Sequence, residues 1–201
     1  MLFFFLFIGV AYATVSTVTP DVKITGRSNE VLGKTIAIDA DNGIAAIGAP
    51  GYAGAKGRVY IYEQSSATVW TQAQAIDNWF GNVISFGNAV DISNNALVIG
   101  APSRTVSSQQ NAGMVFLYGK ASNSDTDYSL INFLDLGSSA ASGDYLGASV
   151  GVHQNVGSNT GTIIAGYYGH SSSKGKVALW EFTCLNMFDD TCTSSVSNLL
   201  I

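Results

Sequence analysis

The sequence predicts an all-β fold built from three similar four-stranded antiparallel units. One set of landmarks, formed by glycines and short apolar runs, recurs three times along the 201 residues. The runs are short and rich in β-branched and aromatic residues, which favour strands. After the N-terminal segment, no stretch carries a helical apolar period longer than about two turns. Four short strands in a repeat of this length correspond to one blade, so the chain is expected to form a partial β-propeller of about three blades.

The repeat is marked by glycines at constant places. The first glycine of each repeat follows the previous one after 54 and then 60 residues: Gly33, Gly87 and Gly147. A second landmark ends a predicted strand in each repeat, as Gly48-Ala49-Pro50, Gly100-Ala101-Pro102 and Gly166-Tyr167-Tyr168. Proline cannot donate to a strand ladder, so the first two landmarks stop the strand there. The third lacks both alanine and proline, and its turn is expected to be rebuilt.

Four segments follow from these landmarks. They are a signal peptide (1–13), an N-terminal segment that is a candidate edge strand (14–31), three repeats (32–85, 86–145 and 146–182), and a disulfide loop with a tail (183–201).

The first thirteen residues have the pattern of a secretory signal peptide. An apolar run from Leu2 to Val10 is followed by Ala11-Tyr12-Ala13, a small-x-small cleavage pattern. The run is shorter than the roughly 20 residues that span a bilayer, so no membrane span is expected after cleavage. The alternative is a buried N-terminal strand. A secreted or cell-surface location is therefore expected.

Composition and cysteine content fit an exported protein that does not bind nucleic acid. Only 11% of residues are charged, and 9 are Lys or Arg, too few for a phosphate-binding surface. The two cysteines, Cys184 and Cys192, are close together in the chain and are expected to form a local disulfide. A metal site is the alternative for this pair.

Phe86-Gly87 followed by Gly100-Ala101-Pro102 resembles the motif pair of the FG-GAP repeat, found in the propellers of integrin α subunits. The resemblance covers roughly residues 32–182 and is strongest in the second repeat. It implies a β-propeller whose typical members close a ring of about seven blades. Three blades leave open edges, so the chain is interpreted as a fragment or divergent short member, as a module that completes a ring by self-association, or as an open arc.

Integrin-like members hold calcium between the two motifs through several carboxylates, and this chain departs from that pattern. The first repeat offers Asp39 and Asp41 there, and the second offers only Asp91. Calcium takes six to eight oxygens. A weak cation site at Asp39 and Asp41 or a plain turn are the alternatives; no tightly held metal and no other cofactor are expected.

The sequence contains no recognisable catalytic constellation. His153 and His170 are the only histidines, and no Gly-x-Ser-x-Gly elbow is present. The expected function is therefore binding or adhesion to an extracellular protein or glycan, through loops that follow the Gly-Ala-Pro positions. The candidate contact residues are Tyr52, Arg104, Tyr167 and Tyr168. The alternative is that these are structural turn residues, and a structural or self-assembling module is the alternative function.

Overall fold

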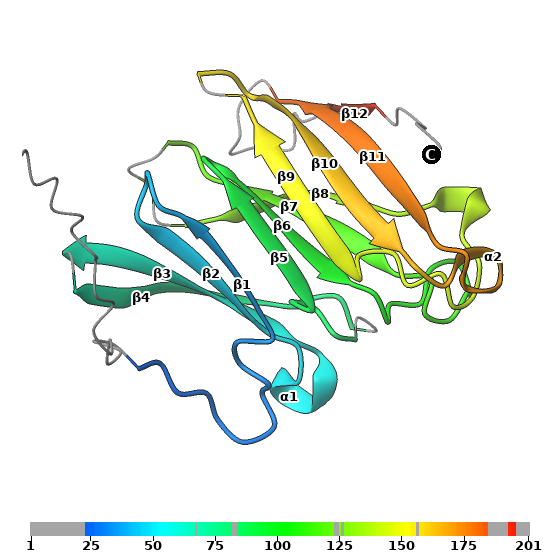
Figure 1. Cartoon of the computed structure of the whole chain (residues 1–201), viewed down its shortest axis with the longest axis horizontal. Coiled ribbons are helices and arrows are strands. Elements are labelled where there is room, and N and C mark those ends of the chain that lie inside the picture. The colour runs from blue at the N-terminus through cyan, green and yellow to red at the C-terminus, as the bar shows by residue number, and fades with distance from the viewer. Residues whose placement is uncertain are drawn as a thin grey trace, which may run out of the picture.

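The structure, a computed structural model, describes residues 23–66, 68–81, 84–122, 125, 127–155, 157–184 and 193–195. These residues form three four-stranded antiparallel sheets (Figure 1). The all-β class and the three four-stranded units predicted from the sequence are thereby confirmed. Signal-peptide residues 1–13, residues 14–22 and Cys192 lie outside the described residues.

Each sheet is a simple meander in which strands pair in chain order. Sheet 1 comprises β1 (Thr35–Asp39), β2 (Ile44–Ala49), β3 (Arg58–Ser66) and β4 (Val69–Asp77). Sheet 2 comprises β5 (Ala89–Ser93), β6 (Ala96–Ala101), β7 (Met114–Gly119) and β8 (Ser129–Leu134). Sheet 3 comprises β9 (Ser149–Gln154), β10 (Thr160–Tyr167), β11 (Lys176–Thr183) and β12 (Thr193–Ser195). Two four-residue helical turns, α1 (Tyr52–Ala55) and α2 (His170–Ser173), and a 3₁₀ turn, η1 (Gly137–Ser139), lie in the loops.

The fourth strand of sheet 3 differs from the sequence-based boundary. β12 pairs with β11, aligning Thr183 with Thr193, whereas the sequence places residues 183–201 after the third repeat. A three-residue strand is too short to leave a period-2 pattern. Thr183 and Thr193 are the chain neighbours of the two cysteines, and Cys184 is buried. The disulfide itself stays a prediction.

The sheets are stacked so that sheet 2 lies between the other two (Figure 1). In β6, Leu97 and Ile99 pack toward sheet 1, whereas Ala96 and Val98 pack toward sheet 3. Every residue of β6 and β7 is therefore buried. This two-sided burial explains why these strands have continuous apolar sequences rather than an alternating pattern.

Glycine pairs join neighbouring sheets. A Cβ on Gly48 would overlap the carbonyl oxygen of Gly87, and a Cβ on Gly100 would overlap that of Gly147. Within each repeat the first glycine also donates its N–H to the strand-ending glycine, as Gly87 does to the Gly100 carbonyl at 3.2 Å. The repeated glycines are therefore where adjacent backbones come closest.

A second contact between sheets follows the same period. Gly57 forms a parallel bridge with Phe86, and Gly113 forms one with Leu146. The side chains of Phe86 and Leu146 are both fully buried. Leucine thus fills in the third repeat the place that phenylalanine fills in the second.

The turn after β10 is not rebuilt, contrary to the sequence-based expectation. It has the conformation of the turn after β2: Gly51 and Gly169 have φ near −80°. The carbonyls of Glu30 and Asp144 accept the N–H groups of Gly51 and Gly169 at 3.0 and 3.2 Å. The preceding loop therefore holds this turn, and neither alanine nor proline is required.

Among the described residues, no helix has the length and apolar character needed to cross a bilayer.

Replacing Gly100 by alanine tests the close approach of sheets 2 and 3. The new methyl group overlaps the Gly147 backbone, so we expect Gly100→Ala to destabilise the fold by about 3 kcal/mol, as overpacking does. The measurement is the free energy of unfolding in urea. The control is Gly81→Ala, where a Cβ meets nothing within 4 Å. Equal, small effects of both substitutions contradict the close approach.

Candidate binding site at one end of sheet 1

After β4 the chain makes a turn in which Trp79 points outward and Phe80 points inward. The Asn78 side chain accepts the N–H of Phe80 at 2.9 Å, an Asx-type turn that fixes the local backbone. Phe80 folds back against Phe116, with ring centroids 5.7 Å apart. Trp79, which lies between Asn78 and Phe80 in the chain, is 85% exposed. An exposed tryptophan is uncommon and marks a candidate contact residue.

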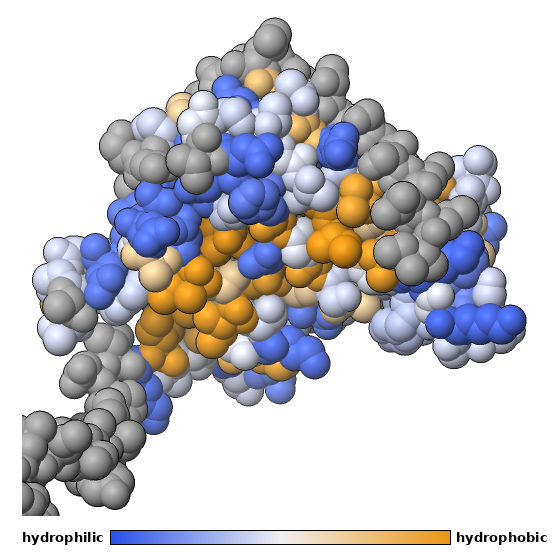
Figure 2. Space-filling model, turned by 45° about the horizontal axis from the view of Figure 1, so that its top comes forward, coloured by the Kyte–Doolittle hydropathy of each residue, from blue (hydrophilic) through white to orange (hydrophobic). Residues whose placement is uncertain are grey.

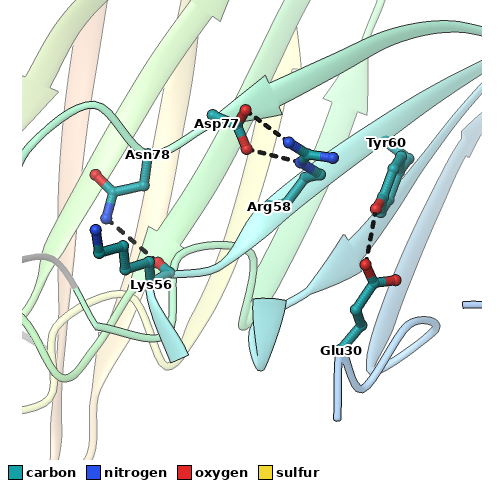
Figure 3. A network of polar contacts seen from close by, with 6 residues as sticks. All are labelled: Glu30, Lys56, Arg58, Tyr60, Asp77 and Asn78. Atoms are coloured by element: carbon teal, nitrogen blue, oxygen red, sulfur yellow. Dashed lines mark hydrogen bonds and ion pairs between the residues drawn. The ribbon is translucent and has the colours of Figure 1, made fainter. Parts of the chain in front are cut away.

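Next to this turn, Arg58 and Asp77 form a two-point ion pair across β3 and β4 (Figure 3). Nε and Nη2 of Arg58 each donate to a carboxylate oxygen of Asp77 at 2.7 Å. The hydrogen bonds that Arg58 donates to Asp77 are the main reason why the pKa of Arg58 is raised above its ordinary value, while burial acts in the opposite direction. The guanidinium is thus held in one orientation.

The fixed guanidinium of Arg58 stacks on the ring of Tyr52. The Arg58 Cζ lies 3.7 Å from the centroid of the Tyr52 ring, a cation–π distance. A hollow of about 230 Å³ is lined by Tyr52, Ala53, Lys56, Gly57, Asp77, Asn78 and Trp79. We call these seven residues together with Arg58 the Tyr52 site. It combines two aromatic side chains with a carboxylate, an amide and an ammonium group.

A second hollow adjoins the Tyr52 site on the other side of α1. It has a volume of about 470 Å³ and is lined by residues 27–30 and 51–54, so Tyr52 and Ala53 belong to both hollows. Glu30 lies at its base, 4% exposed. One Glu30 oxygen accepts the hydroxyl of Tyr60 at 3.3 Å (Figure 3). The other accepts the N–H of Arg27 at 2.9 Å. The carboxylate therefore stabilises the wall of the hollow.

The structure does not bring the four sequence-predicted contact residues together. Arg104 lies in the loop after β6, with its Cζ 5.6 Å from the ring centroid of Phe80. Burial lowers its pKa. Its Nε and Nη1 are buried without a hydrogen-bond partner among the described residues. Arg104 is half-buried beside the Phe80 ring.

Tyr167 and Tyr168 occupy different environments although they are adjacent. Tyr167 is buried with the sheet 2–sheet 3 core, and burial raises its pKa. Tyr168 is exposed and stacks on Tyr145, with ring centroids 5.0 Å apart and planes nearly parallel. Of the four predicted residues, Tyr52 and Tyr168 present aromatic surface at loops, and Tyr167 does not.

Asp144 and His170 form a polar pair that the sequence did not indicate. His170 Nδ1 lies 3.2 Å from one oxygen of Asp144, and the other oxygen accepts the N–H of Ala141 at 2.7 Å. Asp144 occupies in the third repeat the place of Glu30 in the first, three residues before the leading glycine. Both buried carboxylates hold the loop that precedes their repeat.

Two of the three carboxylates weighed as weak cation ligands, Asp39 and Asp91, have structural partners. One Asp39 oxygen accepts from Asn42 Nδ2 at 2.8 Å and from the N–H of Asn94 at 2.9 Å. Asp91 accepts the N–H of Val152 at 2.8 Å. Asp41 is exposed. In the described part of the chain, no three His, Cys, Asp or Glu side chains are grouped as metal ligands.

Sequence reasoning missed Trp79, Arg58 and Asp77. Asn78-Trp79 follows the last predicted strand of the first repeat, and Asn78 is a turn signal that places Trp79 in a loop. The pairing of Arg58 with Asp77, 19 residues apart, depends on the β3–β4 register and has no sequence signal.

A scan against models of known protein families finds no match, and no curated protein matches the chain by sequence.

Replacing Arg58 by lysine tests the ion pair. Lysine keeps the charge but loses the two-point contact and the planar group over Tyr52. Because the Asp77 side chain is 37% exposed, solvent screens the pair, and we expect a loss of about 1 kcal/mol in the free energy of unfolding. Arg27→Lys, at an exposed position, is the matched control. A loss that is equal in both variants contradicts a specific role for Arg58.

Proposed function

We propose that this chain is a secreted or surface-exposed binding module, a partial β-propeller of FG-GAP type that recognises a protein or glycan ligand through its rim loops. The observation that carries the proposal is Trp79, 85% exposed beside the Tyr52 ring. Tryptophan and tyrosine supply large contact areas with few rotatable bonds, so exposed pairs of them are typical binding anchors.

The propeller interpretation is supported by the way the sheets repeat. β1, β5 and β9 lie next to one another, and each sheet continues outward from that strand (Figure 1). Inner strands that meet around one axis, with three strands leading away from each, are the arrangement of propeller blades. The loops that follow β2, β6 and β10 then lie on one rim, and α1 of the Tyr52 site belongs to the first of them.

The size of the Tyr52 site indicates how a ligand is recognised. At about 230 Å³, it is smaller than the roughly 300–1,000 Å³ of sites that enclose a drug-sized molecule. It fits one side chain or one sugar ring of a longer ligand, with Asp77, Asn78 and Lys56 as hydrogen-bonding groups. The adjoining hollow next to Arg27 extends the contact surface along the rim.

Ligand binding is tested on arrays of glycans and extracellular matrix proteins, followed by titration against any ligand found. Trp79→Ala is expected to weaken binding about tenfold or more, since truncating an aromatic anchor costs upward of about 1.4 kcal/mol. Trp70→Ala is the matched control because Trp70 pairs with Gln64 near the far end of β4. Unchanged affinity in Trp79→Ala excludes the Tyr52 site, and the absence of any ligand on the arrays contradicts the binding function.

Secretion is tested by expressing the whole sequence in a secreting host. The protein is expected in the medium with Thr14 as its first residue, and its mass is expected to rise on reduction by the two hydrogens of one disulfide. Retention in the cell with Met1 intact, or a mass that reduction leaves unchanged, contradicts the respective prediction.

A further inference from the structure

Sheet 2 defines two kinds of sheet face in this protein. Its incoming face, which packs on the preceding sheet, includes Val90 and Ile92 of β5. Its outgoing face, which packs on the following sheet, includes Val98 of β6 and Val115 of β7. The same two faces can be identified in sheets 1 and 3 by counting from the repeated glycines.

The incoming face of sheet 1 is exposed. Ile36 and Ile38 stand three and five residues after Gly33, as Val90 and Ile92 stand after Gly87. Ile36 and Ile38 are 64% and 59% exposed, whereas Val90 and Ile92 are each 7% exposed. Two large apolar side chains on neighbouring positions of one strand face are a marker of an unfilled interface.

The outgoing face of sheet 3 is exposed in the same way. Ile164 and Val177 occupy the places of Val98 and Val115, relative to the glycines that end β6 and precede β7. They are 44% and 40% exposed, whereas Val98 and Val115 are fully buried. Together with Ser149, Val150, Gly151 and Gly166 they line a hollow of about 190 Å³.

At each end of the stack, one glycine lacks the partner that the equivalent glycines have between sheets. A Cβ on Gly166 would meet only the Ser149 side chain, whereas the equivalent Gly48 and Gly100 each face the backbone of the next sheet. A Cβ on Gly33 meets nothing within 4 Å, although Gly147 at the equivalent place faces the carbonyl of Met114 at 2.7 Å. Gly166 and Gly33 are thus the two halves of one further glycine contact.

Hydrogen bonds between the first strands of neighbouring sheets run in the same direction along the stack. The Thr35 hydroxyl accepts the N–H of Val90 at 3.3 Å, and the Ser93 hydroxyl accepts the N–H of Gln154 at 3.1 Å. A side chain of one sheet therefore accepts from the backbone of the next. Ser149 of β9, exposed, holds the place of Thr35, and the N–H of Ile36 holds the place of the Val90 donor.

We infer that the outgoing face of sheet 3 binds the incoming face of sheet 1 of a second copy of this chain. The two exposed faces are the two sides of an interface that occurs twice within the molecule, between sheets 1 and 2 and between sheets 2 and 3. Figure 2 shows apolar side chains gathered on one side of the molecule within a polar surface. The complement of each face is on the same chain, so a second copy supplies it.

Such a contact is head-to-tail, since different faces meet. It closes into a ring if the rotation between copies allows and otherwise propagates. Burying Ile36 and Ile38 of one copy against Ile164 and Val177 of the next removes four exposed apolar side chains from water. The contact uses sheet faces and leaves the Tyr52 site at the loop end free, so it does not depend on the proposed ligand.

The test uses the protein expressed from its whole sequence, analysed by light scattering after gel filtration and by sedimentation velocity. Wild type is expected to be an oligomer that dissociates on dilution. Ile36→Asp, which blocks the incoming face, and Ile164→Asp, which blocks the outgoing face, are each expected to be monomeric. Mixed together, these two variants retain one intact contact, so they are expected to form a one-to-one dimer that does not grow.

Gly166→Ala gives an independent variant that leaves the apolar surface unchanged. Its methyl group enters the space of the next sheet's backbone, so assembly is expected to be lost while the circular dichroism spectrum and thermal midpoint of the dilute monomer are kept. Val69→Asp, at an exposed position of β4 outside both faces, is the control and is expected to assemble as wild type.

Three results would overturn the inference. They are a wild type that stays monomeric at all concentrations, Ile36→Asp and Ile164→Asp variants that fold and assemble as wild type, and variants that remain monomeric when mixed. Loss of ligand binding in Trp79→Ala with unchanged assembly separates this inference from the proposed function.

Discussion

The structure depends on the close approach of backbones at two glycine pairs, Gly48 with Gly87 and Gly100 with Gly147. No side chain fits between these pairs, so the first strand of each sheet lies against the previous sheet at a fixed place. Stacking three sheets in this way buries both faces of sheet 2 and forms two apolar cores. A single sheet has no second layer to cover its apolar face, and the stack supplies that layer.

This stacking determines which polar side chains are engaged between the sheets. Along β1 and β5, the carboxylates of Asp39 and Asp91 accept backbone N–H groups of the neighbouring sheet. Their lone pairs are thus used in hydrogen bonds that hold neighbouring sheets together. The Tyr52 site lies at the strand ends, where the chain passes from β2 to β3 and leaves β4.

The sequence predicted part of this site. Tyr52 was identified because it follows Gly-Ala-Pro, and it lines both hollows. Tyr167 directly follows the glycine that ends its strand, which is the place of Ala49 in the first repeat, and both of these residues are buried. Trp79 and Asp77 were missed, since the end of β4 and its register with β3 follow from pairing between distant residues rather than from local pattern.

By itself, the sequence determined the fold class and the number of units. Glycine spacing, short β-branched runs and turn residues act locally, so seven of the strands β1 to β8 lie within one residue of where the sequence predicts them. The exception is β3, which is predicted to end at Tyr62 and continues to Ser66. Tertiary structure alone decided which faces are covered. Ile36 and Val90 have the same place in their repeats and similar apolar character, and only the presence of a preceding sheet makes one buried and the other exposed. Burial is a property of neighbours in space, which a local pattern does not contain.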